Sequence, residues 1–279
     1  MHSMSLPSSC EAMLRALRQR HGIDFRHYMP GSLLRRITLR MERVGAQDYA
    51  DYADYLASAA DECDQLLNTL LINHTAFFRD PDVWTALASQ VAALIAERPA
   101  GAPLRIWSAG CATGQEPYSL AMLLAELIGP EQLAASVTIY ATDVDGEALQ
   151  QVRQARYDAW AVRMVPPQLL ERYFNWDTTH ATVCKPLRRA VVAGRHNLLT
   201  DAPLAQIDLL LCRNVLIYLN SAAQTQVVGR LRTALSEAGL LVLGKTELGF
   251  PVPQGLHWIS REHRIAAKTL DWWPGQTSW

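Results

Sequence analysis

The sequence predicts an α/β fold with a mainly parallel sheet, preceded by an all-helical unit and carrying a small antiparallel insertion. Three patterns support this prediction. From Glu11 to Leu71 the apolar residues recur at helical spacing. Beyond Pro103, short apolar runs alternate with longer helical segments, which is typical of βαβ units. From Tyr173 to Val192 the chain is richer in Thr, Val and Cys and alternates in polarity, which favours antiparallel strands.

Composition excludes several classes of protein. The chain has 279 residues, 49% of them hydrophobic and 19% charged, enough for one large or two smaller domains. A formal net charge of -1 argues against a surface built to neutralise nucleic-acid phosphates. Five scattered cysteines without a CxxC pair predict neither a disulfide framework nor a metal site. Without a signal-like start or a membrane-spanning run, we expect a cytoplasmic protein with no membrane insertion.

The helical part is expected to fall into short helices and one bridging helix. Gly22, Pro30 and Gly45 separate its apolar runs. Pro is tolerated in the first turn of a helix, so Arg79-Asp80-Pro81 predicts a further helix that runs to about Arg98 and bridges two domains. We therefore expect a helical domain over residues 1–78 and a linker helix over 79–102.

The remaining chain, 103–279, predicts the α/β domain. Its expected strands and helices alternate, with a β-subdomain at about 173–195. The strands are expected at 104–107, 137–141, 207–211 and 239–244, and the helices at 118–127, 148–155 and 222–235.

A glycine-containing turn follows the first expected strand, in the segment Ile106-Trp107-Ser108-Ala109-Gly110-Cys111-Ala112-Thr113-Gly114-Gln115-Glu116-Pro117-Tyr118-Ser119. Gly110 and Gly114 allow a sharp turn and a close approach to a ligand, as cofactor loops after a first strand require. A dinucleotide or nucleoside triphosphate is disfavoured, because the third glycine of GxGxxG is missing and no Lys-Ser/Thr follows Gly114. The alternative is an ordinary strand-to-helix turn.

An acidic residue ends the next expected strand, in Ile139-Tyr140-Ala141-Thr142-Asp143-Val144-Asp145. A carboxylate in this position can accept hydrogen bonds from both ribose hydroxyls of a nucleoside. Asp143 is the better candidate for this role. Asp145, followed by Gly146 and Glu147, is more typical of a helix N-cap, and N-capping is also the alternative for Asp143.

Polar residues also end the strand at 207–211, which continues as Cys212-Arg213-Asn214-Val215-Leu216-Ile217-Tyr218. Ligands of open α/β sheets bind at the carboxyl ends of the strands, so Arg213, Asn214 and Tyr218 are expected to face one crevice. Cys212 has no fixed His partner nearby and is better explained as a small buried residue than as a nucleophile.

A fourth motif, Asn73-His74-Thr75-Ala76-Phe77-Phe78-Arg79-Asp80, precedes the α/β domain. Taken alone, its two Phe residues followed by Arg-Asp are compatible with helix packing and a surface ion pair.

Together these segments, with His-Asn-Leu-Leu at 196–199, resemble the chemotaxis receptor methyltransferase (CheR) family over nearly the whole chain. The resemblance implies a helical N-terminal domain that recognises receptors and a Rossmann-like S-adenosylmethionine (SAM)-dependent methyltransferase domain with a small β-subdomain. It also implies protein-glutamate O-methyltransferase activity on chemoreceptors, giving glutamate methyl esters and S-adenosylhomocysteine (SAH), in chemotaxis adaptation and signalling. Lys245-Thr246-Glu247 stands where the family more often has His-Ser-Glu, and no role is assigned to this segment.

The resemblance also implies the site residues. Residues expected around SAM are Asn73, Thr75, Arg79, Glu116, Asp143, Asn197, Leu198, Arg213 and Asn214, with Gly110 in the cofactor loop. By charge and hydrogen-bonding capacity, Glu116 can hold the ammonium of SAM, Asp143 its ribose, and Asn197 the adenine edge. Arg79 and Tyr218 are the family's candidates for the transfer site. A glutamate acceptor is already ionised near neutral pH, so no strong general base is expected.

Partner recognition is predicted for Arg36, Arg40 and Arg43, which lie near one face at helical spacing and suit an acidic receptor helix. A solvated basic face is the alternative from spacing alone. Some family members also dock a receptor C-terminal peptide at the β-subdomain. Two rival functions remain from the residues: methylation of another substrate, and a module that senses SAM or its product without turnover.

Overall fold

The structure is a computed structural model that describes residues 6–99, 102–247 and 255–269. The chain divides into two compact units. The helical unit comprises the chain up to Ile72 together with Ile217–Thr225, and the α/β unit comprises Asn73–Leu216 together with the chain from Gln226 onward. Among the described helices, none combines the length and apolar character needed to cross a membrane.

The helical unit confirms the predicted all-helical start of the chain. Its core is apolar, with Leu17, Ile37 and Leu66 fully buried. Pro30 occupies the first turn of its second α-helix, where a missing N–H costs no hydrogen bond. The elements are α1 (Ser8–His21), η1 (Phe25–His27), α2 (Pro30–Val44), α3 (Tyr49–Ser58) and α4 (Glu62–Leu70).

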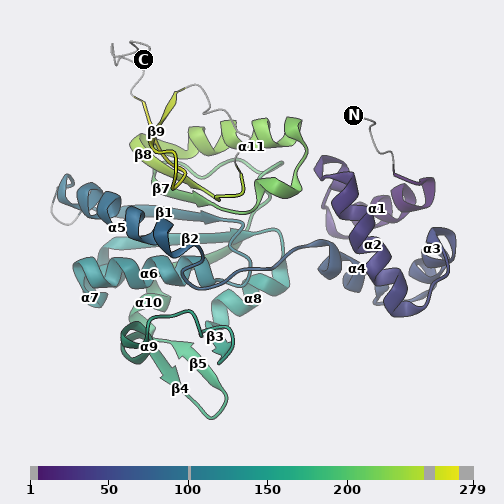
Figure 1. The fold of residues 1–279 in the computed structure, drawn as a ribbon, viewed down its shortest axis with the longest axis horizontal. Helices are drawn as coiled ribbons and strands as arrows, with labels where there is room; N and C mark the ends of the chain where they lie inside the picture. Colours follow the sequence, from purple (N-terminus) through teal and green to yellow (C-terminus); the bar gives the residue numbers. More distant parts are fainter. Residues whose placement is uncertain (1–5, 100–101, 248–254, 270–279) are drawn as a thin grey trace. The chain divides into compact units, whose positions relative to one another are not determined.

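A seven-stranded sheet forms the centre of the α/β unit, in the order β6-β2-β1-β7-β8-β10-β9 (Figure 1). The first five strands pair in parallel, and β10 pairs antiparallel with both β8 and β9. All six residues of β7 are buried, as expected for a central parallel strand covered on both faces. The strands are β1 (Leu104–Ala109), β2 (Val137–Asp143), β6 (Val191–Arg195), β7 (Ile207–Cys212), β8 (Leu235–Leu243), β9 (Leu256–Ser260) and β10 (Ile265–Lys268).

Helices cover the two faces of this sheet. In Figure 1, α6 and α7 lie below the sheet and α11 lies above it. Alternate residues of one strand serve opposite faces: Leu209 and Leu211 belong to the core that contains α5 and α6, whereas the equally buried Leu210 points the other way. The helices are α5 (Pro81–Ala96), α6 (Gln115–Ile128), α7 (Pro130–Ser136), α8 (Gly146–Gln154), α9 (Pro167–Tyr173), α10 (Lys185–Ala190), η2 (Leu216–Tyr218) and α11 (Ser221–Ala234).

A small antiparallel sheet is present, but its strands differ from the expected range. The sheet has the order β3-β5-β4, with β3 (Arg156–Asp158), β4 (Phe174–Trp176) and β5 (His180–Val183). Val191–Arg195, expected in the insertion, instead pairs in parallel with β2 as the edge of the large sheet. Val191 and Val192 favour a strand of either kind, so composition alone does not decide whether this strand pairs in parallel or antiparallel.

The expected linker helix also differs in its surroundings. α5 lies in the α/β unit, and its buried face, which includes Trp84 and Leu87, joins the same core as β1 and α6. The C-terminal tail with Trp272, Trp273 and Trp279 lies outside the described residues.

Candidate functional site: the carboxyl edge of the parallel sheet

Loops after β1, β2 and β6 meet at one edge of the sheet, because parallel strands carry their carboxyl ends to the same side. The Gly110 N–H donates to the Thr142 carbonyl at 2.8 Å, which joins the first two loops. The His196 N–H donates to the Asp143 carbonyl at 3.0 Å, which joins the third. Backbone hydrogen bonds therefore hold the three motif segments side by side.

Asp143 lies at the centre of this edge. Its carboxylate accepts the N–H of Ala112 at 2.8 Å and that of Asp145 at 3.0 Å. Burial raises the pKa of Asp143, while these amide hydrogen bonds act in the opposite direction. Each oxygen accepts one amide and keeps a second lone-pair direction, so the carboxylate can still accept a pair of hydroxyls.

Asp145 has the structural role predicted for it. Its side chain accepts the N–H groups of Glu147 and Ala148 and so caps α8. The other oxygen of the same carboxylate accepts the Asn73 amide at 2.5 Å. Asn73 is thereby fixed beside the loop after β2, and Thr75 lies half-buried two residues further along the same segment.

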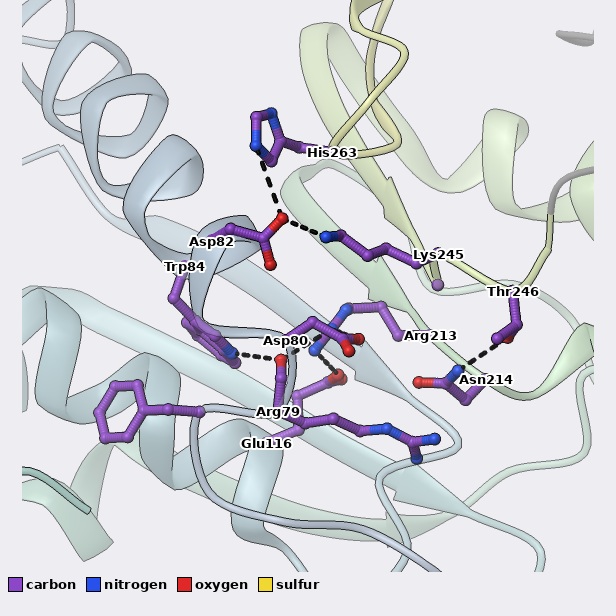
Figure 2. A network of polar contacts seen from close by, with 12 residues as sticks. Arg79, Asp80, Asp82, Trp84, Glu116, Arg213, Asn214, Lys245, Thr246 and His263 are labelled. Atoms are coloured by element: carbon purple, nitrogen blue, oxygen red, sulfur yellow. Dashed lines mark hydrogen bonds and ion pairs between the residues drawn. The ribbon is translucent and has the colours of Figure 1, made fainter. Parts of the chain in front are cut away.

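A buried guanidinium, that of Arg213, is the hub of the polar network in Figure 2. The side chain of Arg213 is 2% exposed and contacts Asp80 at 2.7 Å and Glu116 at 3.4 Å. Ser108, near the end of β1, donates to the other oxygen of Glu116 at 2.8 Å. Burial raises the pKa of Glu116, and the charge of Arg213 opposes that shift. The first turn of α6 and the residue that follows β7 are thus joined by one partly buried ion pair.

The Phe77-Phe78-Arg79-Asp80 segment presents polar groups to this network. Phe77 is fully buried and makes edge-to-face contacts with Tyr157 and Phe174. Phe78 and Asp80 have φ of 50° and 58°, a left-handed backbone that non-glycine residues rarely adopt. Such strained backbone concentrates at functional sites, where the surrounding structure holds it in place.

Arg79 contributes both backbone and side chain. Its carbonyl accepts the Trp84 indole N–H and an Arg213 N–H, each at 2.9 Å, as Figure 2 shows. Its guanidinium donates to the His74 carbonyl at 3.1 Å. The ion partner of Asp80 is the buried Arg213, so the alternative of helix packing with an Arg79–Asp80 surface pair does not describe this segment.

The loop after β6 holds Asn197 by its own turn. The Asn197 side-chain oxygen accepts the Leu199 N–H at 3.0 Å, and its backbone N–H donates to Asp201 at 2.9 Å. Because the side-chain oxygen of Asn197 already accepts this N–H, the side-chain NH₂ of Asn197 is the group that can donate to a ligand. Leu198 is half-buried next to it.

Gly110 is required by its backbone and by its neighbour. It has φ of 73°, and a Cβ added there would lie 2.4 Å from Val215 Cγ2. At Gly114 a Cβ would lie 2.8 Å from the Tyr157 hydroxyl. The space that a Cβ would enter is therefore filled by Val215 at Gly110 and by Tyr157 at Gly114, whereas the sequence had suggested a ligand close to these glycines.

Asn214 and Tyr218 follow β7 but fall in different units. The Asn214 amide donates to Thr246 at 3.1 Å (Figure 2). Tyr218 groups with the helical unit, where its carbonyl accepts the Met29 N–H at 2.8 Å. Cys212 is fully buried, and burial holds the pKa of its thiol well above the usual range, which confirms a neutral core residue.

The three arginines of α2 that were predicted to recognise a partner have different surroundings. Arg40 forms a bidentate ion pair with Glu62, which is 3% exposed and also accepts the Tyr52 hydroxyl at 2.7 Å. Arg36 donates to the Thr69 carbonyl at 2.7 Å. Arg43 is exposed. The expected common basic face is therefore reduced, because two of its members bind inside the helical unit.

Several residues of the network were not singled out from the sequence. Asp80 and Ser108 lie inside quoted motifs, and their positions beside Arg79 and at a strand end were the available signals. Lys245 pairs with Asp82, and His263 lies 3.8 Å from the same carboxylate (Figure 2). These pairs join segments far apart in sequence, which local pattern does not reveal.

Comparison with known proteins identifies the family. Residues 73–263 match the family model described as CheR methyltransferase, SAM binding domain, and residues 9–71 match CheR methyltransferase, all-alpha domain. The chain belongs to the CheR methyltransferase family. It is a SAM-dependent methyltransferase of the CheR type, and in its sequence an all-helical domain precedes the predicted methyltransferase fold.

Similar proteins differ in length and name. The chain is 35% identical to chemotaxis protein methyltransferase 1 of Pseudomonas aeruginosa, covering 66% of this chain and 69% of that protein. It is 29% identical to a chemotaxis protein methyltransferase of Listeria monocytogenes, covering 84% and 87%. A 104.1 kDa uncharacterized protein of Rhodobacter capsulatus is 35% identical over 87% of this chain but only 26% of that protein. The solved magnesium protoporphyrin IX methyltransferase of Synechocystis aligns with 16% identity and a TM-score of 0.33 over 70% of this chain and 71% of that chain.

The donors and acceptors at the sheet edge fit the chemistry of SAM. Arg213 Nε is buried and has no hydrogen-bond partner among the described residues, so a donor is available for an anionic group. SAM carries one carboxylate, one ammonium and a ribose with two hydroxyls. The half-buried carboxylates of Glu116 and Asp143 are acceptors suited to the ammonium and the hydroxyls.

Proposed function

We propose that this chain methylates glutamate side-chain carboxylates in the cytoplasmic helical domain of chemoreceptors, as part of chemotaxis adaptation and signalling in the cytoplasm. The products are glutamate methyl esters and SAH. The observation that carries the proposal is the match of both domains to the CheR family, whose relatives include chemotaxis protein methyltransferases. The left-handed backbone at Phe78 and Asp80, with Asp80 paired to the buried Arg213, supports it.

In this proposal the sheet edge holds the cofactor. Asp143 accepts the ribose hydroxyls, Glu116 the ammonium, and Arg213 donates to the carboxylate. Asn197 donates its amide to the adenine edge, with Leu198 packing against the base. The remaining proposed cofactor residues, Asn73, Thr75, Gly110 and Asn214, shape the surrounding loops.

Transfer requires alignment rather than proton removal. Bound SAM supplies a methyl group on a positively charged sulfur. The glutamate acceptor is ionised near neutral pH, so the protein must orient its oxygen in line with that methyl group and exclude water. We assign this to Arg79, whose guanidinium donates charge-assisted hydrogen bonds to the acceptor, and to Tyr218, which positions it.

Of the three arginines predicted for partner recognition, Arg43 is the exposed one and remains available for an acidic receptor helix. It is exposed, and Leu39, one turn earlier on α2, is 44% exposed. A guanidinium beside an exposed leucine suits the mixed acidic and apolar surface of an amphipathic helix. Arg36 and Arg40 support the proposed surface indirectly, by holding α2 against α4.

The three-stranded sheet is the proposed docking place for a receptor C-terminal peptide. Its edge strand β4 carries Trp176, which is 49% exposed. A hollow of about 290 Å³ beside it is lined by Lys185 and Arg188, among others. An extended acidic peptide could add to the strand edge and place carboxylates near these two cations.

The test is transfer of labelled methyl from SAM to a receptor cytoplasmic fragment. Arg79→Ala and Tyr218→Phe should each lower turnover, for Arg79→Ala on the order of 100-fold, because misalignment of reacting atoms is costly. Matched controls are the exposed Arg261→Ala and Tyr55→Phe, which should retain wild-type turnover. Wild-type rates in both Arg79→Ala and Tyr218→Phe would contradict the assignment.

A further inference from the structure

One buried carboxylate, that of Glu247, holds the loop that follows β7. Glu247 is 1% exposed. Its Oε1 accepts the Val215 N–H at 3.0 Å and the Leu216 N–H at 2.9 Å, and its Oε2 accepts the Gly244 N–H. A side chain that follows β8 thus fixes a loop more than thirty residues earlier in the chain.

The backbone of this loop needs such an acceptor. Asn214 has φ of 61°, so the chain leaves the strand direction there and loses the regular ladder of hydrogen bonds. The N–H groups of Val215 and Leu216 then point into the protein, where an unpaired donor is costly. A single carboxylate satisfies both, because consecutive amides turned to one side form a concave anion-binding surface.

On its opposite side, the loop after β7 packs against Gly110 in the loop after β1. The Val215 side chain lies so close to Gly110 that a Cβ there would be 2.4 Å from Val215 Cγ2. On the β8 side, a Cβ at Gly244 would lie 2.7 Å from the Asn214 nitrogen. The Asn214 amide also donates to Thr246 at 3.1 Å. Segment 213–216 is therefore fixed between the turn at 244–247 and Gly110.

This loop carries two proposed cofactor residues. Arg213 reaches from it into the network of Asp80 and Glu116, and its Nε is the buried donor without a partner among the described residues. A small change in the backbone at Val215 would move the Arg213 side chain, because the two residues are separated by a single position in a buried loop.

We propose that Glu247 is a positioning residue for the cofactor site: its carboxylate fixes the backbone of 214–216 so that Arg213 and Asn214 face SAM. The inference rests on the proposed cofactor roles of Arg213 and Asn214. Glu247 itself does not touch the reacting groups.

The charges around Glu247 allow a pH readout. Burial raises the pKa of Glu247 to about 7, against the lowering effect of the four backbone amides of Gly244, Leu216, Val215 and Asn214. Facing it are Arg264, which donates to the Glu247 carbonyl, and the neutral thiol of Cys212. A protonated Glu247 would place its own O–H among amide donors, which weakens its hold on the loop.

SAH binding to the full-length protein, measured by calorimetry, tests the proposal. Glu247→Gln keeps the size of the side chain but places an NH₂ among N–H donors, so its Kd for SAH should rise at least about tenfold. The control Glu237→Gln, an exposed glutamate of β8, should keep the wild-type Kd. At pH 6 about one molecule in ten keeps an ionised Glu247. Lowering the pH from 8 to 6 should therefore raise the Kd of wild type for SAH about tenfold more than it raises the Kd of Glu247→Gln.

Equal Kd values and parallel pH profiles for wild type and Glu247→Gln would overturn the proposal, since a merely structural role would lower thermal stability alone. If Glu247→Gln does not fold, Glu247→Asp takes its place: it keeps the charge but retracts the carboxylate, and a wild-type Kd in that variant overturns the proposal equally. The readout requires no receptor. An unmethylated receptor glutamate would therefore refute the proposed substrate and leave the result for Glu247 intact.

Discussion

Replacing Gly110 with alanine tests the packing at the cofactor loop, and its cost can be worked from the structure. The added Cβ would lie 2.4 Å from Val215 Cγ2, and the residue would keep φ of 73°. Overpacking of a well-packed region costs about 1–3 kcal/mol, and a left-handed alanine about 1–2 kcal/mol. Gly110→Ala should therefore lower the free energy of unfolding by about 2–5 kcal/mol.

A second substitution separates the two terms. Without its γ carbons, Val215 would leave Cβ at 3.5 Å as its nearest atom to the new methyl group, an ordinary contact. Gly110→Ala/Val215→Ala should therefore be less destabilised than the sum of the single variants, with a coupling energy of about 1–3 kcal/mol. The backbone strain at Gly110 should remain in the double variant.

Urea denaturation followed by tryptophan fluorescence, performed on all four proteins, measures this cycle. Additive effects of Gly110→Ala and Val215→Ala would show that the two loops do not press on each other. A Gly110→Ala variant within about 0.5 kcal/mol of wild type would refute both the contact and the strained backbone.

Three further predictions concern charge. Glu62→Gln leaves Arg40 without its buried partner and should destabilise the helical unit by about 3–5 kcal/mol in thermal or urea unfolding, whereas the exposed Glu42→Gln should change it by less than about 0.5 kcal/mol; equal effects would contradict the buried pair. The pKa of Glu247, about 7 in the folded chain against an ordinary 4.5, makes its stabilising contribution complete below pH 4.5 and lost as the pH rises through 7. Relative to Glu247→Gln, wild type should therefore lose about 3 kcal/mol of unfolding free energy between pH 4.5 and pH 8, and parallel stability curves would refute this. Arg43→Ala should weaken receptor-fragment binding about two- to fivefold at low salt and less at high salt, and an unchanged affinity at low salt would remove Arg43 from the proposed surface.

Local pattern was sufficient to predict β1, β2 and β7 of the parallel sheet and the loops that follow them at its carboxyl edge. β1, β2 and β7 are short apolar runs followed at once by polar or glycine residues, so both the strand and its functional end lie in one continuous segment. The N-cap role of Asp145 was predictable for the same reason, since a cap is decided by its next three residues.

Long-range pairing set the limit of the sequence prediction. Val191 and Val192 favour a strand of either kind, and only the pairing of Val191–Arg195 with β2 shows that this strand is a parallel edge of the large sheet. The C-terminal strand β10 pairs with both β8 and β9, and no local motif predicted either β9 or β10.

Charged residues were the hardest to place. Arg36 and Arg40 flank the buried Leu33 and Ile37 on α2, so helical spacing alone suggests a basic face. In the structure Arg40 instead donates to the carboxylate of Glu62, 22 residues away, because a long side chain at the border of an apolar stripe can reach a neighbouring helix. Glu247 was similarly inconspicuous, because its partners are backbone amides, which leave no trace in the sequence.

The decisive measurement is the chemical nature of the methylated product. Labelled methyl from SAM should be transferred to a receptor cytoplasmic fragment and released as volatile methanol under mild base, because a carboxyl methyl ester hydrolyses under these conditions. Base-stable label would mean a different acceptor atom and would contradict the glutamate assignment. Absence of label despite measurable SAH binding would instead favour a module that senses the cofactor.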